Sequence, residues 1–287
     1  MTWTEQLADE LGRRGVPARQ RETILLEMKD HIACEPASVS RLGNPGELAA
    51  EFADELATQS ARGGALGAFG ALGVAAVALI VSQLGLGAAG GYPGFDNGYS
   101  TALAIPAILC MVIAPQIALV AGTLALLRAL RRRGEPVLPA AEIRLVRRRT
   151  WVGLGAGLAC SVALEVYVLD FLAVEPAWWL GLVGGLAGLA IVALGAAAVS
   201  LRGSGGLVVA ATGPAGDIFD DLPPLRPLRG RPWRLCGVVA GGVAVAMTLG
   251  EWHAEHSLAE GLQRGIFEGV AATVGFVLLG RAIGARR

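Results

Sequence analysis

Long apolar segments alternate with short polar connectors along most of the chain, after a polar opening of about sixty residues. We expect these segments to span a membrane, because about 20 apolar residues cross a hydrocarbon core of about 30 Å. The predicted spans cover residues 65–86, 101–127, 151–174, 177–201, 235–249 and 265–279. The last two are shorter than the others, but Trp233 and Trp252 bracket the fifth span, as aromatic residues at a membrane interface do. The pattern predicts an all-α polytopic membrane protein with a six-span domain over residues 63–287.

Arginines are concentrated in every second connector. The connector between the second and third spans contains Arg131 to Arg133 and Arg147 to Arg149, and more arginines lie in the loop 202–234 and after residue 280. The intervening connectors carry acidic residues, with Arg264 as their only basic residue. Since arginine clusters beside membrane spans stay on the cytoplasmic side, we expect both termini and the loop 202–234 to be cytoplasmic.

The composition agrees with a membrane protein and adds one prediction about helix packing. Hydrophobic residues make up 54% of the chain and charged residues 17%, with a mean hydropathy of +0.55, as is typical of membrane proteins. Several glycines are spaced four apart, which allows helices to approach closely. These pairs are Gly153 with Gly157, Gly181 with Gly185, Gly184 with Gly188, and Gly265 with Gly269. They predict packing within the bundle, with a homodimer contact as the alternative.

Residues 1–62 are predicted to form a small cytoplasmic domain of three amphipathic helices. The first carries the apolar stripe Trp3, Leu7 and Leu11, and the second is expected over residues 18–34. Asn44, Pro45 and Glu47 form a helix-start signal for the third, whose apolar stripe is Leu48, Phe52 and Leu56. We expect Gly63 and Gly64 to form a hinge between this domain and the first span.

The head resembles a known signalling domain. The segments QLADELGRRGVPARQRETILLEMKDHI and VSRLGNPGELAAEFADELA are similar to the HAAS signalling domain in three features. These features are a helix ending in Asp30-His31-Ile32, the turn Leu42-Gly43-Asn44-Pro45 and the run Leu48 to Leu56. HAAS domains lie at the cytoplasmic N-terminus of bacterial multi-span membrane proteins. The resemblance therefore implies a bacterial inner-membrane protein with a regulatory role, often with a PadR-like transcription regulator or a transporter encoded nearby. It supplies no catalytic residues.

Asp30 and His31 are the candidate partner-facing residues of the head. Their position near the end of an amphipathic helix is also compatible with a structural role, because a histidine there interacts favourably with the helix C-terminus. Contact with a partner or sensing of pH is the functional alternative.

Polar side chains inside the predicted spans are candidate functional residues, because ionisable groups are costly there. They are Gln116, Glu165, Asp170 and Glu268. Glu165 is the deepest of the carboxylates, and we expect it to be protonated, to face water, or to accept hydrogen bonds from groups such as Ser161 or Gln116. The sequence favours a polar clasp between helices over a proton or cation pathway through the three carboxylates.

The sequence does not indicate an enzyme. It has no Walker loop, no strand with GxGxxG, no catalytic triad and no CxxC pair. We therefore expect no cofactor and no resident metal, although His253 and His256 beside carboxylates form a weaker metal hypothesis. Residues 1–62 contain eleven acidic and seven basic side chains, and this negative balance argues against direct binding to nucleic acid.

The sequence leads to two functional hypotheses. The first is a regulatory protein whose head relays the state of the membrane domain to a soluble partner, such as a PadR-like regulator. The alternative is a permease or transporter subunit that uses the intramembrane carboxylates, together with ABC-type transporter components. In both cases the lipid bilayer is the surrounding medium, and the basic part of the loop 202–234 is expected to lie along anionic headgroups.

Overall fold

A computed structural model describes residues 2–88, 101–170, 177–202, 206–213, 221, 226–227, 231–255 and 257–283. Helices dominate this part of the chain, and it contains no β-strand. Six of the helices are long and apolar enough to cross a membrane. The prediction of an all-α protein with six spans is therefore confirmed.

The head is built from short helices at the N-terminal end. They are α1 (Trp3–Arg13), α2 (Ala18–Cys34), the 3-10 turn η1 (Pro36–Ser38) and α3 (Val39–Leu42). A capping box starts α1: the Thr2 amide donates to the Glu5 carboxylate at 2.7 Å, and the Thr2 hydroxyl accepts from the Glu5 amide at 3.3 Å. This capping box has the sequence signature T-x-x-E, which is not among the predicted start signals. Helix α2 has the predicted bounds, residues 18–34.

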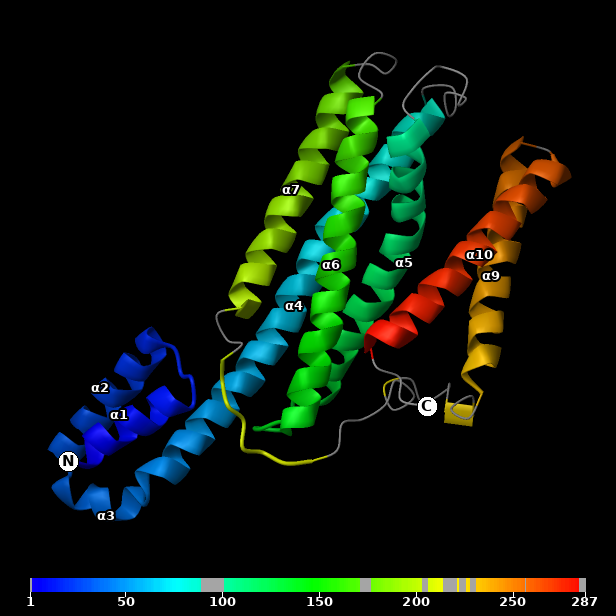
Figure 1. The fold of residues 1–287 in the computed structure, drawn as a ribbon. Helices are drawn as coiled ribbons and strands as arrows, with labels where there is room; N and C mark the ends of the chain where they lie inside the picture. The colour runs from blue at the N-terminus through cyan, green and yellow to red at the C-terminus, as the bar shows by residue number, and fades with distance from the viewer. Residues whose placement is uncertain are drawn as a thin grey trace.

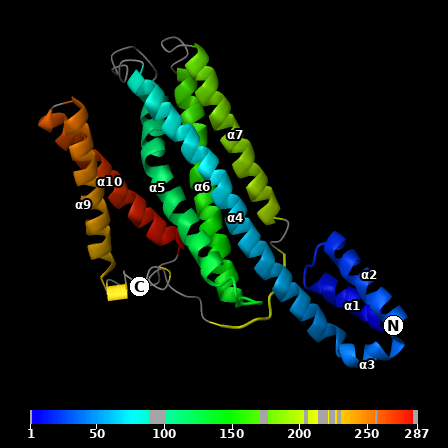
Figure 2. The same cartoon turned by 180° about the vertical axis from the view of Figure 1, so that it is seen from behind.

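The third helix of the head and the first membrane span are one helix, α4 (Pro45–Ala88). Asn44 starts it as predicted, since its side-chain oxygen accepts from the Gly46 amide at 2.9 Å. The helix continues through Gly63 and Gly64 without a break, so the prediction of a hinge at this point was wrong. In Figures 1 and 2, α4 runs as one rod from the head to the far end of the bundle.

Gly64 has a packing role in place of the predicted flexibility. A Cβ atom at Gly64 would overlap the end of the Leu201 side chain, whereas a Cβ at Gly63 would have no neighbour within 4 Å. Leu201 is only 3% exposed, at the end of the helix that packs on α4 here. A missing side chain at Gly64 therefore lets the two helices approach closely.

The membrane part contains a four-helix bundle and a helical hairpin. The bundle consists of α4, α5 (Thr101–Arg131), α6 (Ala140–Asp170) and α7 (Ala177–Arg202). The hairpin consists of α9 (Pro232–Glu255) and α10 (Leu258–Ile283), and it meets the bundle mainly through α10 against α5. The head, the arginine-rich turn between α5 and α6 and the C-terminal end of α10 lie toward the same end of the molecule (Figure 1).

Most of the predicted glycine pairs pack inside the chain. Gly153 and Gly157 lie against Leu72 of α4, which is also in contact with the Gly122 position of α5. Gly265 packs against Thr248 of α9. These contacts support the prediction of packing within the bundle, because the absence of a Cβ is what makes room for each neighbour.

The other two glycine pairs share α7 and differ in what they meet. Gly184 and Gly188 lie against Glu165 of α6. The positions of Gly181 and Gly185 have open space where a Cβ would lie.

Candidate functional site

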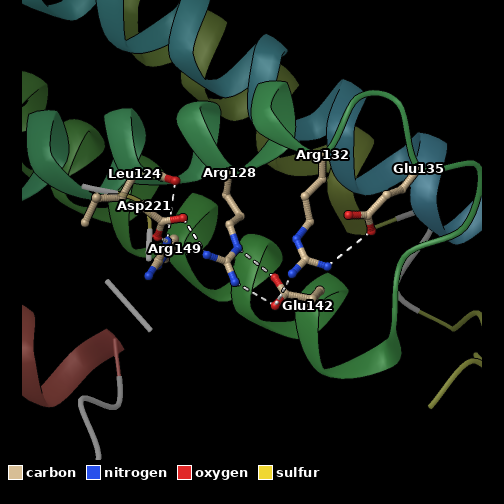
Figure 3. A network of polar contacts seen from close by, with 7 residues as sticks. All are labelled: Leu124, Arg128, Arg132, Glu135, Glu142, Arg149 and Asp221. Carbon is tan, nitrogen blue, oxygen red and sulfur yellow. Dashed lines mark hydrogen bonds and ion pairs between the residues drawn. The ribbon is translucent and has the colours of Figure 1, made fainter. Parts of the chain in front are cut away.

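A network of buried ions lies where the head-side ends of α5 and α6 meet. We use the name ion network for Arg128, Glu142, Arg149 and Asp221. Arg128 is in the last turn of α5, Glu142 is in the first turn of α6, and Arg149 lies two helical turns further along α6. Asp221 comes from the connector between α7 and α9. Figure 3 shows that the four side chains converge on one another, with Arg132 and Glu135 beside them.

The hydrogen bonds between the side chains of the ion network are short. Arg128 holds Glu142 with two parallel bonds, from Nε to Oε2 at 2.8 Å and from Nη2 to Oε1 at 2.6 Å. Asp221 bridges the two arginines: Oδ1 accepts from Arg128 Nη1 at 2.6 Å, and Oδ2 accepts from Arg149 Nη1 at 2.5 Å. Bidentate and charge-assisted bonds of this kind are about twice as strong as neutral ones.

Because these ion pairs are buried, breaking one of them would destabilise the fold. The four residues are between 0% and 4% exposed. Two positive and two negative side chains balance, so no net charge is buried within the four. Removing one partner of a buried ion pair typically costs about 3–5 kcal/mol, because the other charge is left without compensation. The ion network therefore fixes Asp221, and with it the connector, to the base of the bundle.

A second set of contacts ties the same connector to the head. We name residues 207–211 the strap. The Val208 amide donates to the Arg14 carbonyl at 2.9 Å, and Leu207 is buried in the head core. The amides of Ala210 and Ala211 donate to the two carboxylate oxygens of Asp54, at 2.8 and 3.1 Å. The strap therefore connects the end of α1 to the part of α4 that belongs to the head.

The strap also reaches the membrane bundle. Its last residue, Ala211, accepts a hydrogen bond from the Ala140 amide at the start of α6, at 2.9 Å. Asp54, which holds the strap from the other side, is only 7% exposed. A buried carboxylate needs hydrogen-bond donors, and the strap amides supply two.

Helix α4 contacts the turn between α5 and α6 directly. The buried Thr58 hydroxyl accepts from the Leu138 amide at 3.0 Å and donates to the Asp54 carbonyl at 2.8 Å. The Arg62 guanidinium donates to the Glu135 carbonyl at 2.6 Å and to the Arg132 carbonyl. Because carbonyls at a helix end lack partners within the helix, Arg62 caps the C-terminal end of α5.

The head and the head-side end of the bundle share one hydrophobic core. Its buried residues include Leu7 and Leu11 of α1 and Leu138, Ile143 and Val146 from the start of α6 and the turn before it. On α4 the fully buried stripe is made of alanines four residues apart: Ala49, Ala53, Ala57, Ala61 and Ala65. The predicted residues Leu48, Phe52 and Leu56 are partly buried and pack against this stripe.

The predicted partner-facing residues of the head are accessible. Asp30 and His31 are both exposed on α2, and the His31 carbonyl accepts the amide of Glu35 where the helix ends. Leu26, one turn earlier on α2, is 62% exposed. These positions leave Asp30 and His31 free of the head core.

Glu165 lies between α6 and α7. A Cβ on Gly184 or Gly188 of α7 would be 3.6 Å from one of its carboxylate oxygens, so the two glycines expose the α7 backbone to it. The Ser161 hydroxyl, an expected donor to Glu165, instead donates to the Gly157 carbonyl at 3.0 Å. This position between two helices is the one that a polar clasp requires.

The other intramembrane candidates lie elsewhere. Gln116 faces the Gly275 position of α10, and Glu268 of α10 is 7% exposed, with Arg264 Nε 3.8 Å from its Oε1. Helices α7 and α10 lie on opposite sides of the bundle (Figures 1 and 2), so Glu165 and Glu268 are not brought together. Asp170 ends α6, and its side chain lies outside the described residues.

Metal ligands do not cluster in the described part of the chain, where no group of three or more histidine, cysteine or carboxylate side chains could hold an ion. His253 is exposed at the end of α9, and His256 lies outside the described residues. No protein-family model, no curated protein and no solved structure matches this chain.

Proposed function

We propose that this protein is a regulatory protein of a bacterial inner membrane, with the head and both termini in the cytoplasm. Its head would relay the state of the six-span domain to a soluble partner, such as a PadR-like transcription regulator. The observation that carries this proposal is the continuity of α4, which is part of the head core and also the first helix of the bundle.

A continuous helix is a suitable transmitter because a displacement at one end is delivered to the other. Three further contacts stiffen the connection: the strap, the bonds of Thr58 and Arg62 to the α5–α6 turn, and the shared core. A change in packing among the spans would therefore move the head together with the base of the bundle. The protein would exist in equilibrium between two conformations of the head and bundle together. A ligand or partner would shift this equilibrium only as far as its affinities for the two conformations differ.

The exposed end of α2 is the proposed partner face. Asp30 and His31 point away from the core, and their contribution would be specificity through charge and hydrogen bonding. The negative balance of residues 1–62 fits contact with the protein regulator better than contact with its DNA, because phosphate recognition requires a basic surface.

The test is photo-crosslinking from the head of the full-length protein in native membranes. A photoreactive amino acid at His31 is compared with one at Glu51, an exposed control position on α4. The full chain is required because the head shares its core with the bundle. Capture of a DNA-binding regulator from position 31 and not from position 51 supports the proposal. Capture of an ABC-type ATPase supports the transporter-subunit alternative. Equal labelling from both positions would show that the end of α2 is not a specific partner-binding face.

A further inference from the structure

A row of arginines continues into an apolar face on the outside of α6. Arg144 and Arg148 are exposed, and Trp151, Leu158 and Val162 follow on the same side with exposures of 37%, 39% and 46%. Spacings of three and four residues place these side chains on one face of a helix. The opposite face of the same segment carries Glu142 and Arg149 of the ion network, so the start of α6 has a neutralised inner face and a basic outer one.

Helix α7 adds a third cation beside this row. The Arg202 guanidinium carbon lies 6.0 Å from the ring centroid of Trp151, a cation–π arrangement across the two helices. Among the described residues, no carboxylate forms an ion pair with Arg144 or Arg202. Their charges are therefore available to an external anion.

The apolar surface next to these cations lies within two candidate spans. Val192 and Val199 of α7 are 68% and 69% exposed, and a Cβ at Gly155 of α6 or Gly195 of α7 would have no neighbour within 4 Å. In a bilayer these side chains meet acyl chains, and tryptophan at the end of such a face marks the interface with the headgroups. The same surface therefore offers cations at headgroup level and an apolar face directly beyond.

We propose that the head-side ends of α6 and α7 bind an anionic phospholipid. Arg144, Arg148 and Arg202 hold its phosphate and anionic headgroup, Trp151 lies at the level of the glycerol, and the acyl chains lie over the exposed apolar residues of both helices. Guanidinium groups suit phosphate because they present several donors in one plane. A zwitterionic lipid carries its own cation and therefore interacts more weakly with the arginines. A free phosphate makes no contact with the apolar face.

The test measures lipid binding to the purified full-length protein in detergent. The probes are phosphatidylglycerol and phosphatidylcholine with identical acyl chains, and inorganic phosphate, with bound lipid counted by native mass spectrometry. We expect phosphatidylglycerol to bind preferentially. The variant R144Q/R202Q should bind it about 25-fold more weakly, because each arginine near an anionic surface contributes a factor of about five.

A matched control separates this site from general charge effects. The variant R13Q/R41Q removes two exposed arginines of the head and should leave phosphatidylglycerol binding unchanged. Equal binding of phosphatidylglycerol by R144Q/R202Q and the unmodified protein would overturn the proposal, as would equal retention of the two lipids. Competition by inorganic phosphate at the same concentration as the lipid would assign the arginines to a free anion. Unchanged thermal unfolding of R144Q/R202Q shows that the loss concerns the site.

Discussion

Asp221 is expected to stabilise the folded protein far more than an ordinary surface carboxylate. Its two oxygens bridge Arg128 and Arg149 at 2.6 and 2.5 Å, and its side chain is fully buried. The variant D221N removes the charge while keeping the shape. The remaining amide oxygen is uncharged and can accept from one of the two arginines, and Arg128 keeps both bonds to Glu142, so Arg149 is left without a charged partner. We expect a loss of about 3 kcal/mol in the free energy of unfolding, at the lower end of the range for broken buried pairs.

Two further variants separate charge pairing from a general effect of mutation. In R149M/D221N the unpaired guanidinium is also gone, so at least about 1 kcal/mol of the loss should be recovered, because replacing both charges of a buried pair is often nearly neutral. The control is E10Q on α1. It breaks the ion pair between Glu10 and Arg13, which spans 3.0 Å with side chains 26% and 69% exposed, and an exposed pair contributes about 0–1 kcal/mol.

The assay is equilibrium unfolding of the full-length protein in mixed micelles, with the denaturing detergent titrated and tryptophan fluorescence recorded. The expected order of stability is unmodified protein and E10Q highest, R149M/D221N intermediate and D221N lowest. If D221N is as stable as E10Q, the ion network does not hold the connector. If R149M/D221N is less stable than D221N, the loss does not come from an unpaired arginine.

Two other predictions concern the contacts of α4. G64A should destabilise the bundle by about 1–3 kcal/mol in the same assay, because the added Cβ displaces the Leu201 side chain; G63A, whose Cβ meets nothing, should be neutral or slightly stabilising because alanine favours a helix more than glycine does. Equal effects of the two variants would refute the packing role of Gly64. D54A should raise hydrogen exchange of the strap amides about 100-fold or more, since two charge-assisted bonds are lost. The exposed control E51A should leave this exchange unchanged, and protection of the strap in D54A would show that Asp54 does not hold it.

The membrane architecture was predictable because it depends on local patterns. Five of the six predicted spans lie within one helix, and the third, residues 151–174, is helical as far as Asp170, where the described part of it ends. Helix α2 begins and ends at the predicted residues. Apolar length and helix-start signals predict these elements because each signal lies within a single segment of the chain. The prediction of a hinge was wrong because it used local information alone. Two consecutive glycines favour flexibility, but Gly64 packs against Leu201, which is far away along the chain, and this contact cannot be inferred from the glycines themselves.

The ion network and the strap could not be predicted in the same way. Arg149 belongs to the arginine clusters that predict the topology, but it is buried against Asp221, a residue 72 positions away. Asp221 could not be identified as a partner of these arginines, because pairing across a long connector leaves no periodic signal in the sequence. A local hint was available for Glu142: an acid in the first turn of α6 follows soon after an arginine at the end of α5, across a short turn. Contacts between distant segments are set by tertiary packing, which sequence spacing does not report.

The central claim is that the head and the membrane bundle move as one unit. It is tested most directly by electron paramagnetic resonance distances between spin labels at Lys29 of α2 and Leu158 of α6, both exposed, with the four native cysteines replaced. In lipid nanodiscs the continuous α4 and the shared core predict a single narrow distance distribution. A broad distribution, of the kind that a flexible junction at Gly63 and Gly64 produces, would contradict the claim.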